Sequence, residues 1–370
     1  MTLRERLLAV FRGETPDVVP AYADLSHWHV AAAGATFVPI RTKDTVEDRR
    51  LFDLHKELRL GCHLFGPTMY ETRYDDTVQE TITCEGGLFQ HVIETPHGRI
   101  MEQRRWNPMS FSYDITRRMI QRVADLKALN YAYSRRRVMP AYDRFAEFDR
   151  RVGDMGVIAG VGGYCGLGFL MSRYMGFAQT VYALADHRAE VEQTIELIND
   201  VRLEEMKVTA KSPAPFVLFS DNLSSDVHSP PLFDRYMKGF YTRLADVCHA
   251  EGKWLSVHLD GRMHGLLGRL RECGADCAEA ITPAPDGDIT AREARAEAGP
   301  GMILWGGIPA SIWQQYTPEK KFVRFVRSHL ELRKECPRMV IAPSDQAVPG
   351  TPRKRLEMFR DLVEEYGRYD

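Results

Sequence analysis

The sequence of 370 residues lacks the long apolar runs and the strong net charge that mark several classes of protein. No stretch approaches the roughly 18 consecutive apolar residues that a membrane-spanning helix needs. The formal net charge is -2, so electrostatics gives no reason to expect a nucleic acid or an anionic membrane as partner. A small molecule is therefore the expected substrate.

The seven cysteines are odd in number and scattered, and the N-terminus reads as an amphipathic helix and not as a secretory signal. We therefore expect reduced thiols and a cytoplasmic location. Cys273 and Cys277 are four residues apart, a spacing that could suggest a metal pair. Because Cys277 lies in an apolar stretch typical of a buried strand, burial is the favoured interpretation.

Short apolar strands alternate with amphipathic helices along most of the chain, which predicts an α/β protein. Residues 115–151 are expected to be helical, and period-two alternation over 78–106 indicates an antiparallel β-hairpin inserted in the N-terminal part. The other strands are predicted near residues 18, 60, 157, 216, 254, 277, 303 and 339. Eight such strands, each followed by a helix, predict a single (β/α)8 (TIM) barrel domain over residues 1–370.

Polar side chains stand where these predicted strands end, and in a barrel the chemistry lies at the carboxyl ends of the strands. His258 and Asp260 follow one strand two residues apart, so alternation aims both side chains the same way. The remaining strand-end acids are Asp24, Asp221, Glu279 and Asp345. An alternative is that these residues cap helices and hydrogen-bond neighbouring strands.

Several carboxylates and an imidazole at one barrel mouth need protons, cations or a metal to balance them. We predict that His258, Asp260 and Asp345 bind a divalent metal such as zinc, manganese or iron(II). Asp221 or Glu279 would be a fourth ligand or a proton donor. Asp221, His258 and Glu279 are thus the predicted catalytic residues.

Aromatic and glycine-rich loops also follow predicted strands. The predicted substrate contacts are Asp24, His27, Trp28, Tyr164 and Trp305. The glycine-rich loop at 162–168 does not have the G-x-G-x-x-G spacing, and no Lys-Ser/Thr follows it, so it is a weak signal for a dinucleotide or phosphate. Its glycines are expected to let the backbone approach a ligand or a neighbouring loop closely.

The chain resembles the uroporphyrinogen decarboxylase superfamily, which includes cobalamin-dependent methyltransferases on a (β/α)8 barrel. The resemblance rests on the opening segment 4–20, on His-Leu-Asp-Gly at 258–261, on Trp-Gly-Gly-Ile-Pro at 305–309, and on the segment 342–352. It implies zinc-binding positions at residues 258, 260 and 345, where the methyltransferase branch has a His-x-Cys pair and a further Cys. This sequence keeps the imidazole and has aspartate at both thiolate positions. Either a metal site persists with oxygen ligands, or the site does something else.

The resemblance implies different substrates for the two branches of the superfamily. True uroporphyrinogen decarboxylases hold the carboxylates of their substrate with arginines in an N-terminal Arg-Gln-Ala-Gly-Arg segment. The corresponding loop after Pro20 contains no arginine, so a highly carboxylated porphyrinogen is expected to be poorly held.

The resemblance therefore leaves three functions open. The first is a methyltransferase that uses the metal as a Lewis acid and passes a methyl group from a small O- or N-methylated donor to a corrinoid. The corrinoid would be supplied by a partner protein, since no corrinoid-binding domain is evident in the sequence. The second is a metal-free lyase or decarboxylase of a small or porphyrin-like carboxylated substrate. In it His258 is the general acid, and Asp24 or Asp221 stabilises a protonated substrate. The third is a non-catalytic binding protein. A homodimer is compatible with each.

Overall fold

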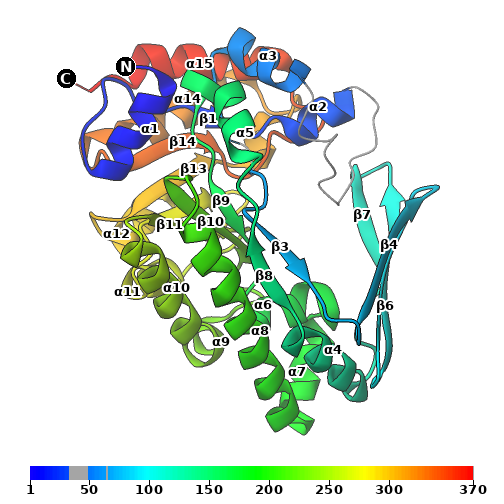
Figure 1. Cartoon of the computed structure of the whole chain (residues 1–370). Coiled ribbons are helices and arrows are strands. Elements are labelled where there is room, and N and C mark those ends of the chain that lie inside the picture. Colours follow the sequence, from blue (N-terminus) through cyan, green and yellow to red (C-terminus); the bar gives the residue numbers. More distant parts are fainter. Residues whose placement is uncertain (33–48, 64–65, 370) are drawn as a thin grey trace.

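The computed structural model describes residues 1–32, 49–63 and 66–369, and parallel strands form its centre (Figure 1). The barrel strands are β1 (Tyr22–Ala23), β2 (Gly61–Cys62), β9 (Gly160–Gly162), β10 (Phe216–Leu223), β11 (Trp254–Leu259), β12 (Cys277–Ile281), β13 (Ile303–Ile308) and β14 (Met339–Pro343). The strands from β9 to β14 hydrogen-bond in chain order, and β1 pairs with β2. Parallel bridges from Ala21 to Ile341 and from Cys62 to Gly156 connect these two sheets. The described part of the chain thus forms a barrel of eight strands, which confirms the predicted (β/α)8 fold.

The barrel strands are short apolar runs, and in β12 and β14 every residue is buried. Burial on both faces is expected of parallel strands that have helices outside and a packed interior. The helix α1 (Leu3–Arg12) closes the amino-terminal end of the barrel, where Phe11 stacks on Phe216 with ring centroids 4.8 Å apart. The carboxyl ends of the strands are left as the open face for chemistry.

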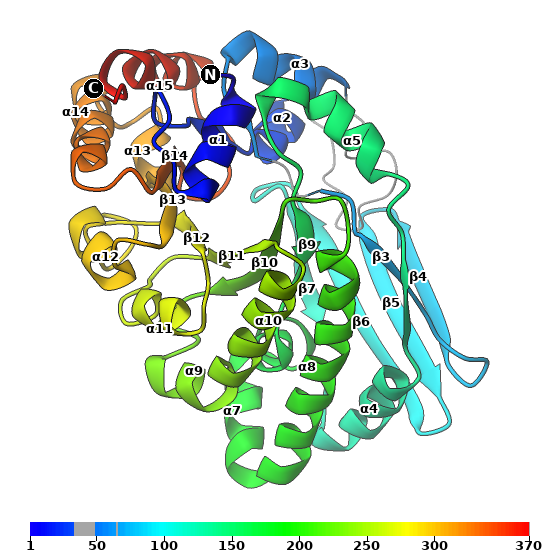
Figure 2. The same cartoon turned by 60° about the vertical axis from the view of Figure 1, so that its left-hand side comes forward.

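Helices surround the barrel on its outer side (Figure 2). They are α2 (Ser26–Ala32), α3 (Arg49–Leu58), α6 (Gly166–Phe169), α7 (Phe177–Asp186), α8 (Arg188–Ala210), α9 (Pro230–Tyr236), α10 (Lys238–Ala250), α11 (Leu267–Glu272), α12 (Ala291–Ala298), α13 (Ala310–Trp313), α14 (Glu319–Leu330) and α15 (Arg353–Tyr366). Apolar residues at helical spacing face inward, as do Phe322, Val326 and Leu330 of α14. Within the described ranges, no helix is long and apolar enough to cross a membrane.

An inserted region between β2 and β9 stands beside the barrel (Figure 1). It contains the ribbon of β3 (Tyr70–Arg73) and β8 (Arg137–Pro140), the helices α4 (Leu126–Ser134) and α5 (Phe145–Val152), and a four-stranded antiparallel sheet. That sheet consists of β4 (Gln79–Glu85), β5 (Leu88–Thr95), β6 (Gly98–Asn107) and β7 (Ser112–Arg117). The alternation over 78–106 corresponds to β4, β5 and β6, and β7 is an additional strand.

The expectation of continuous helix over 115–151 is wrong in part. Residues 115–117 belong to β7, and Arg137–Pro140 form β8. Residues 115–117 form a hairpin with the neighbouring strand β6, whereas β8 pairs with the distant strand β3. In both segments strand pairing overrides local helical preference.

A buried ion cluster joins the inserted region to α8. The carboxylate of Glu205 is fully buried and pairs with the guanidinium groups of Arg202 and Arg136, the latter at 3.4 Å. It also accepts a hydrogen bond from the hydroxyl of Tyr70 in β3 at 3.0 Å. One carboxylate thus pairs with two cations at the contact between the ribbon and the barrel helices.

Candidate active site at the carboxyl end of the barrel

A histidine and a glutamate form a buried pair at the barrel mouth. The parallel register of β11 and β12 places His258 directly opposite Glu279, so both side chains lie on the same face. The Glu279 carboxylate is hydrogen-bonded to Nδ1 of His258, and the two residues are 4% and 5% exposed. Both residues were predicted because they are polar side chains at the ends of barrel strands. The strand register then places them opposite each other.

The charge of His258 follows from this pairing. Burial by itself lowers the pKa of an imidazole, because the charged form loses water. The charge of Glu279 and its hydrogen bond act in the opposite direction. With further contributions from Asp345 and Asp260, they raise the pKa of His258 to about 9. The side chain is therefore an imidazolium at neutral pH, held inside the barrel mouth.

Two aspartates complete the acidic part of the mouth. Burial and the charges of Glu279, Asp260 and Asp24 raise the pKa of Asp345 to about 6, although the His258 charge opposes this. The Asp345 side chain is nevertheless exposed to solvent, which is consistent with a position inside a concave mouth. Asp260 is also exposed and accepts a hydrogen bond from the amide of Asn222 at 3.3 Å.

The backbone is irregular where the strands reach the mouth. Tyr164, Asn222 and Ala280 have positive φ angles of 44°, 50° and 63°, which side-chain-bearing residues seldom adopt. The register of β10 against β11 shifts between Phe219 and Leu223, and that of β12 against β13 shifts between Ala278 and Ile281, as in a β-bulge. Gly306 accommodates the bulge in β12, because a Cβ there would lie 2.7 Å from the backbone nitrogen of Ile281. Such irregularities re-aim side chains and are frequent beside active sites.

Three predicted substrate contacts interact with other parts of the protein, and the predicted loop with His27 and Trp28 is the helix α2. The Asp24 carboxylate accepts hydrogen bonds from the backbone and hydroxyl of the first residue of α2. Nε2 of His27 lies 3.1 Å from the Phe111 carbonyl oxygen, and Nε1 of Trp28 donates to the Thr351 carbonyl at 2.7 Å. These contacts fix α2 beside the mouth. Whether the side chains contact a substrate stays a prediction.

Asp221 is fully buried and is held by protein groups. Its carboxylate accepts a hydrogen bond from the Tyr241 hydroxyl at 2.8 Å and from the Cys165 backbone nitrogen at 3.2 Å. A Cβ on Gly168 would lie 1.9 Å from this carboxylate, so the glycine-rich loop packs closely around it. As placed, Asp221 anchors that loop, and its predicted catalytic role has no support from this geometry.

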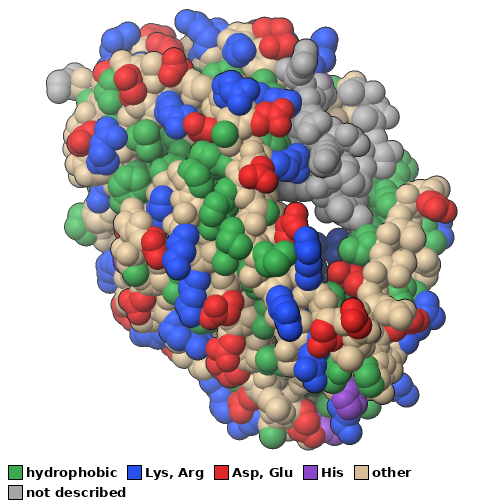
Figure 3. Space-filling view, in the orientation of Figure 1, with side chains coloured by type: hydrophobic (Ala, Val, Ile, Leu, Met, Phe, Trp, Pro, Cys, Tyr) green, Lys and Arg blue, Asp and Glu red, His purple; other side chains and the backbone are tan. Residues whose placement is uncertain are grey.

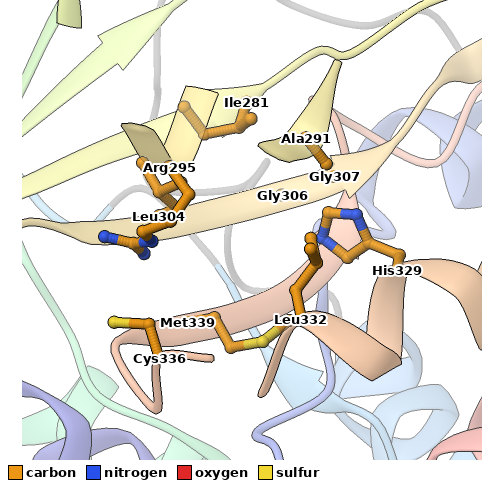
Figure 4. Close-up of a pocket in the computed structure, with 10 residues that line it drawn as sticks. All are labelled: Ile281, Ala291, Arg295, Leu304, Gly306, Gly307, His329, Leu332, Cys336 and Met339. Atoms are coloured by element: carbon orange, nitrogen blue, oxygen red, sulfur yellow. The ribbon is translucent and has the colours of Figure 1, made fainter. Parts of the chain in front are cut away.

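Trp305 lies in the barrel interior and not at an open surface. It is 2% exposed and packs edge-on against Tyr22. At Gly307 the backbone contacts the outer helix α14, because a Cβ at this position would lie 2.1 Å from Nε2 of His329. Figure 4 shows the small cavity at this position, about 20 Å³ in volume, between the strands and the outer helices. It has room for about one water molecule, so these glycines serve packing here.

His63 is a site residue that the sequence interpretation missed. It directly follows β2, and its Nε2 lies 3.8 Å from Oε1 of Glu279. Its ring also packs against Trp305, with centroids 4.5 Å apart. The sequence could have identified His63, because it is a polar residue at the end of a predicted barrel strand, as His258 is.

The metal prediction is neither confirmed nor contradicted. Within the residues that the structure describes, no group of three or more His, Cys, Asp or Glu side chains is placed to hold one metal ion. His258, Asp260 and Asp345 interact electrostatically without forming such a group. Their role as metal ligands therefore stays a prediction, as does zinc.

Comparisons with known proteins point to one family. A family model described as uroporphyrinogen decarboxylase (URO-D) matches residues 112–366, well over half of the chain. No curated protein matches the sequence significantly. Among solved structures, a methyltransferase from Methanosarcina mazei is similar over 99% of both chains, with a TM-score of 0.62 and 16% sequence identity. At this identity the likeness shows a common fold.

Two further solved structures are much less similar. The GH18 chitinase ChiB from Flavobacterium johnsoniae covers 62% of this chain and 80% of its own, with 12% identity and a TM-score of 0.33. A Bacteroidetes-affiliated GH5 cellulase covers 62% and 75%, with 12% identity and a TM-score of 0.36. Neither TM-score supports a functional argument.

Proposed function

Because the chain belongs to the uroporphyrinogen decarboxylase family, we propose that it is an acid–base enzyme that removes a carboxyl group from a small carboxylated substrate. The buried pair of His258 and Glu279 at the barrel mouth is the observation that carries this proposal. An imidazolium held by a carboxylate is a proton donor in a fixed position. Decarboxylation needs such a donor at the carbon that loses its carboxyl group.

The proposed step assigns each group a part. The bond between the substrate carbon and its carboxylate breaks, carbon dioxide leaves, and the electron pair stays on the carbon, delocalised into a conjugated group of the substrate. His258 then donates its proton to that carbon and forms the new C–H bond. Glu279 holds the ring and stabilises its charged form, and the neutral imidazole regains a proton from solvent.

Isotope labelling tests this step. The protein would be incubated in D₂O with conjugated acids labelled with ¹³C at the carboxyl group. Labelled carbon dioxide and a product with one deuterium at the former carboxyl position would support the proposal. Release of carbon dioxide without deuterium in the product would contradict His258 as an exchangeable proton donor.

The pH dependence of turnover follows from the raised pKa of His258. The protonated ring is the active form, so turnover is expected to be independent of this group at neutral pH and to be lost as pH rises through about 9. Well above that value, each pH unit should lower the rate about tenfold. The measurement is kcat across pH 7 to 10. A loss centred on the ordinary histidine pKa of about 6.5 would contradict the assigned proton state.

A second candidate function is methyl transfer to a corrinoid supplied by a partner protein. The observation that favours it is the carboxylate on Nδ1 of His258, because metal-binding histidines are commonly oriented in this way. His258, Asp260 and Asp345 would hold the metal, which would act as a Lewis acid on the oxygen or nitrogen of the methyl donor. The similar structure from M. mazei is named as a methyltransferase.

Metal content separates the two functions. If methyl transfer is right, purified protein should contain about one divalent metal per chain by elemental analysis, and His258→Ala should lose it. His264→Ala is the matched control, since that side chain is 75% exposed. If decarboxylation is right, the turnover of the wild type should be unchanged by a chelator that removes all bound metal.

A further inference from the structure

Arg173 lies over Tyr164 beside the barrel mouth, and its guanidinium has no acceptor among the residues that the structure describes. It belongs to a π-helical turn (Leu170–Tyr174), a feature that is frequent at functional sites. Its Cζ lies over the ring of Tyr164, 5.8 Å from the centroid. In the described ranges of the chain, this guanidinium makes no hydrogen bond or ion pair, and the residue is only partly exposed. Burial lowers the pKa of Arg173, yet an arginine keeps its charge.

The inserted sheet carries a second arginine, whose charge acts on Arg173. On β6, Arg104 makes two hydrogen bonds to the carboxylate of Glu102, at 2.8 and 2.7 Å, and both residues are buried. The charges of this pair act on Arg173. Among the described side chains, these two guanidinium groups and one carboxylate leave one positive charge without a balancing anion. Figure 3 shows that the surface is hollowed between the barrel and the inserted sheet, with basic and acidic side chains around the opening.

Tyr164 connects this cationic site with the catalytic mouth. It follows β9 at the carboxyl end of the barrel and has the positive φ described above. Its phenol experiences the negative charges of Asp221 and Asp260 and the positive charges of Arg173 and Arg104. A molecule that lies on the Tyr164 ring beside Arg173 is therefore also within the field of the acidic group that includes Asp260.

We propose that Arg173, with the added positive charge of Arg104, binds a second carboxylate of the substrate, so that the substrate is a small dicarboxylic acid. This inference rests on the proposed decarboxylation, in which one carboxyl group leaves near His258 and the other stays bound to Arg173. The planar fork of a guanidinium matches a carboxylate, and the single uncompensated charge suits a monoanionic group better than a phosphate dianion. The ligand would supply the acceptor that Arg173 lacks.

Binding of succinate tests the proposal without turnover. Saturation-transfer NMR titrations would compare succinate with the uncharged diamide succinamide on the wild type and on Arg173→Gln. We expect the wild type to bind succinate and not succinamide, and Arg173→Gln to bind it roughly 10- to 100-fold more weakly. Arg173→Lys keeps the charge without the fork and should lie between the two, which shows that the loss does not come from misfolding.

Arg105→Gln is the matched control. Arg105 neighbours Arg104 on β6, is exposed, and lies on the opposite face of the sheet, so its succinate binding should equal that of the wild type. The proposal is overturned if the wild type does not bind succinate, if succinamide binds equally, or if Arg173→Gln binds like the wild type. Failure of the proposed chemistry is distinguishable, because it would leave Arg173-dependent succinate binding intact.

Discussion

Replacing His258 by glutamine is expected to lower kcat by about 10²- to 10⁴-fold, the usual contribution of a positioned general acid. Glutamine is similar in size and can hydrogen-bond to Glu279, but it has no proton to give at the reacting carbon. KM should change little, because the arginines proposed to hold the substrate are untouched. The measurement is kcat and deuterium incorporation at neutral pH.

The control for this variant is His264→Gln, which removes an exposed imidazole and should leave kcat unchanged. Glu279→Gln gives an independent check, because it removes the main charge that raises the pKa of His258. Its alkaline loss of activity should move well below pH 9. A His258→Gln variant with wild-type kcat would show that the proton comes from another group.

The barrel and the pair of His258 and Glu279 at its mouth could be predicted from sequence, because both depend on local patterns. Apolar strands alternating with helices predict the barrel, and the strand-end rule then selects His258 and Glu279. The same rule selected Asp221, which is fully buried and bonded to Tyr241. The register shift of β10 near Asp221 depends on packing against neighbouring elements, so the sequence pattern could not predict it.

The remaining site residues depend on contacts between distant parts of the chain. The sequence places Trp28 in a loop that contacts the substrate, but its indole nitrogen donates to the carbonyl of Thr351, 323 positions away. Arg173 lies in a turn that no motif marks, and its electrostatic neighbour Arg104 comes from the inserted sheet. The sequence predicts the antiparallel strands of the inserted sheet, but it does not predict that Arg104 of this sheet acts on Arg173.

Replacing Glu205 by glutamine is expected to lower the free energy of unfolding by about 3–5 kcal/mol, since it leaves buried cations without their counter-charge. Glu205 is fully buried between Arg202 and Arg136. Glutamine fills the same space and can still accept a hydrogen bond from Tyr70, so the loss reports the charge itself. Chemical denaturation gives the measurement.

Glu204→Gln is the matched control, one residue away on α8, where the side chain is 62% exposed and paired with Lys207. It should change the free energy of unfolding by no more than about 0.5 kcal/mol. Equal stability of the two variants would mean that the buried cations are satisfied in another way. The inserted region carries Arg104, and the Glu205 cluster holds its ribbon against α8. Glu205→Gln should therefore also weaken succinate binding, whereas Glu204→Gln should not.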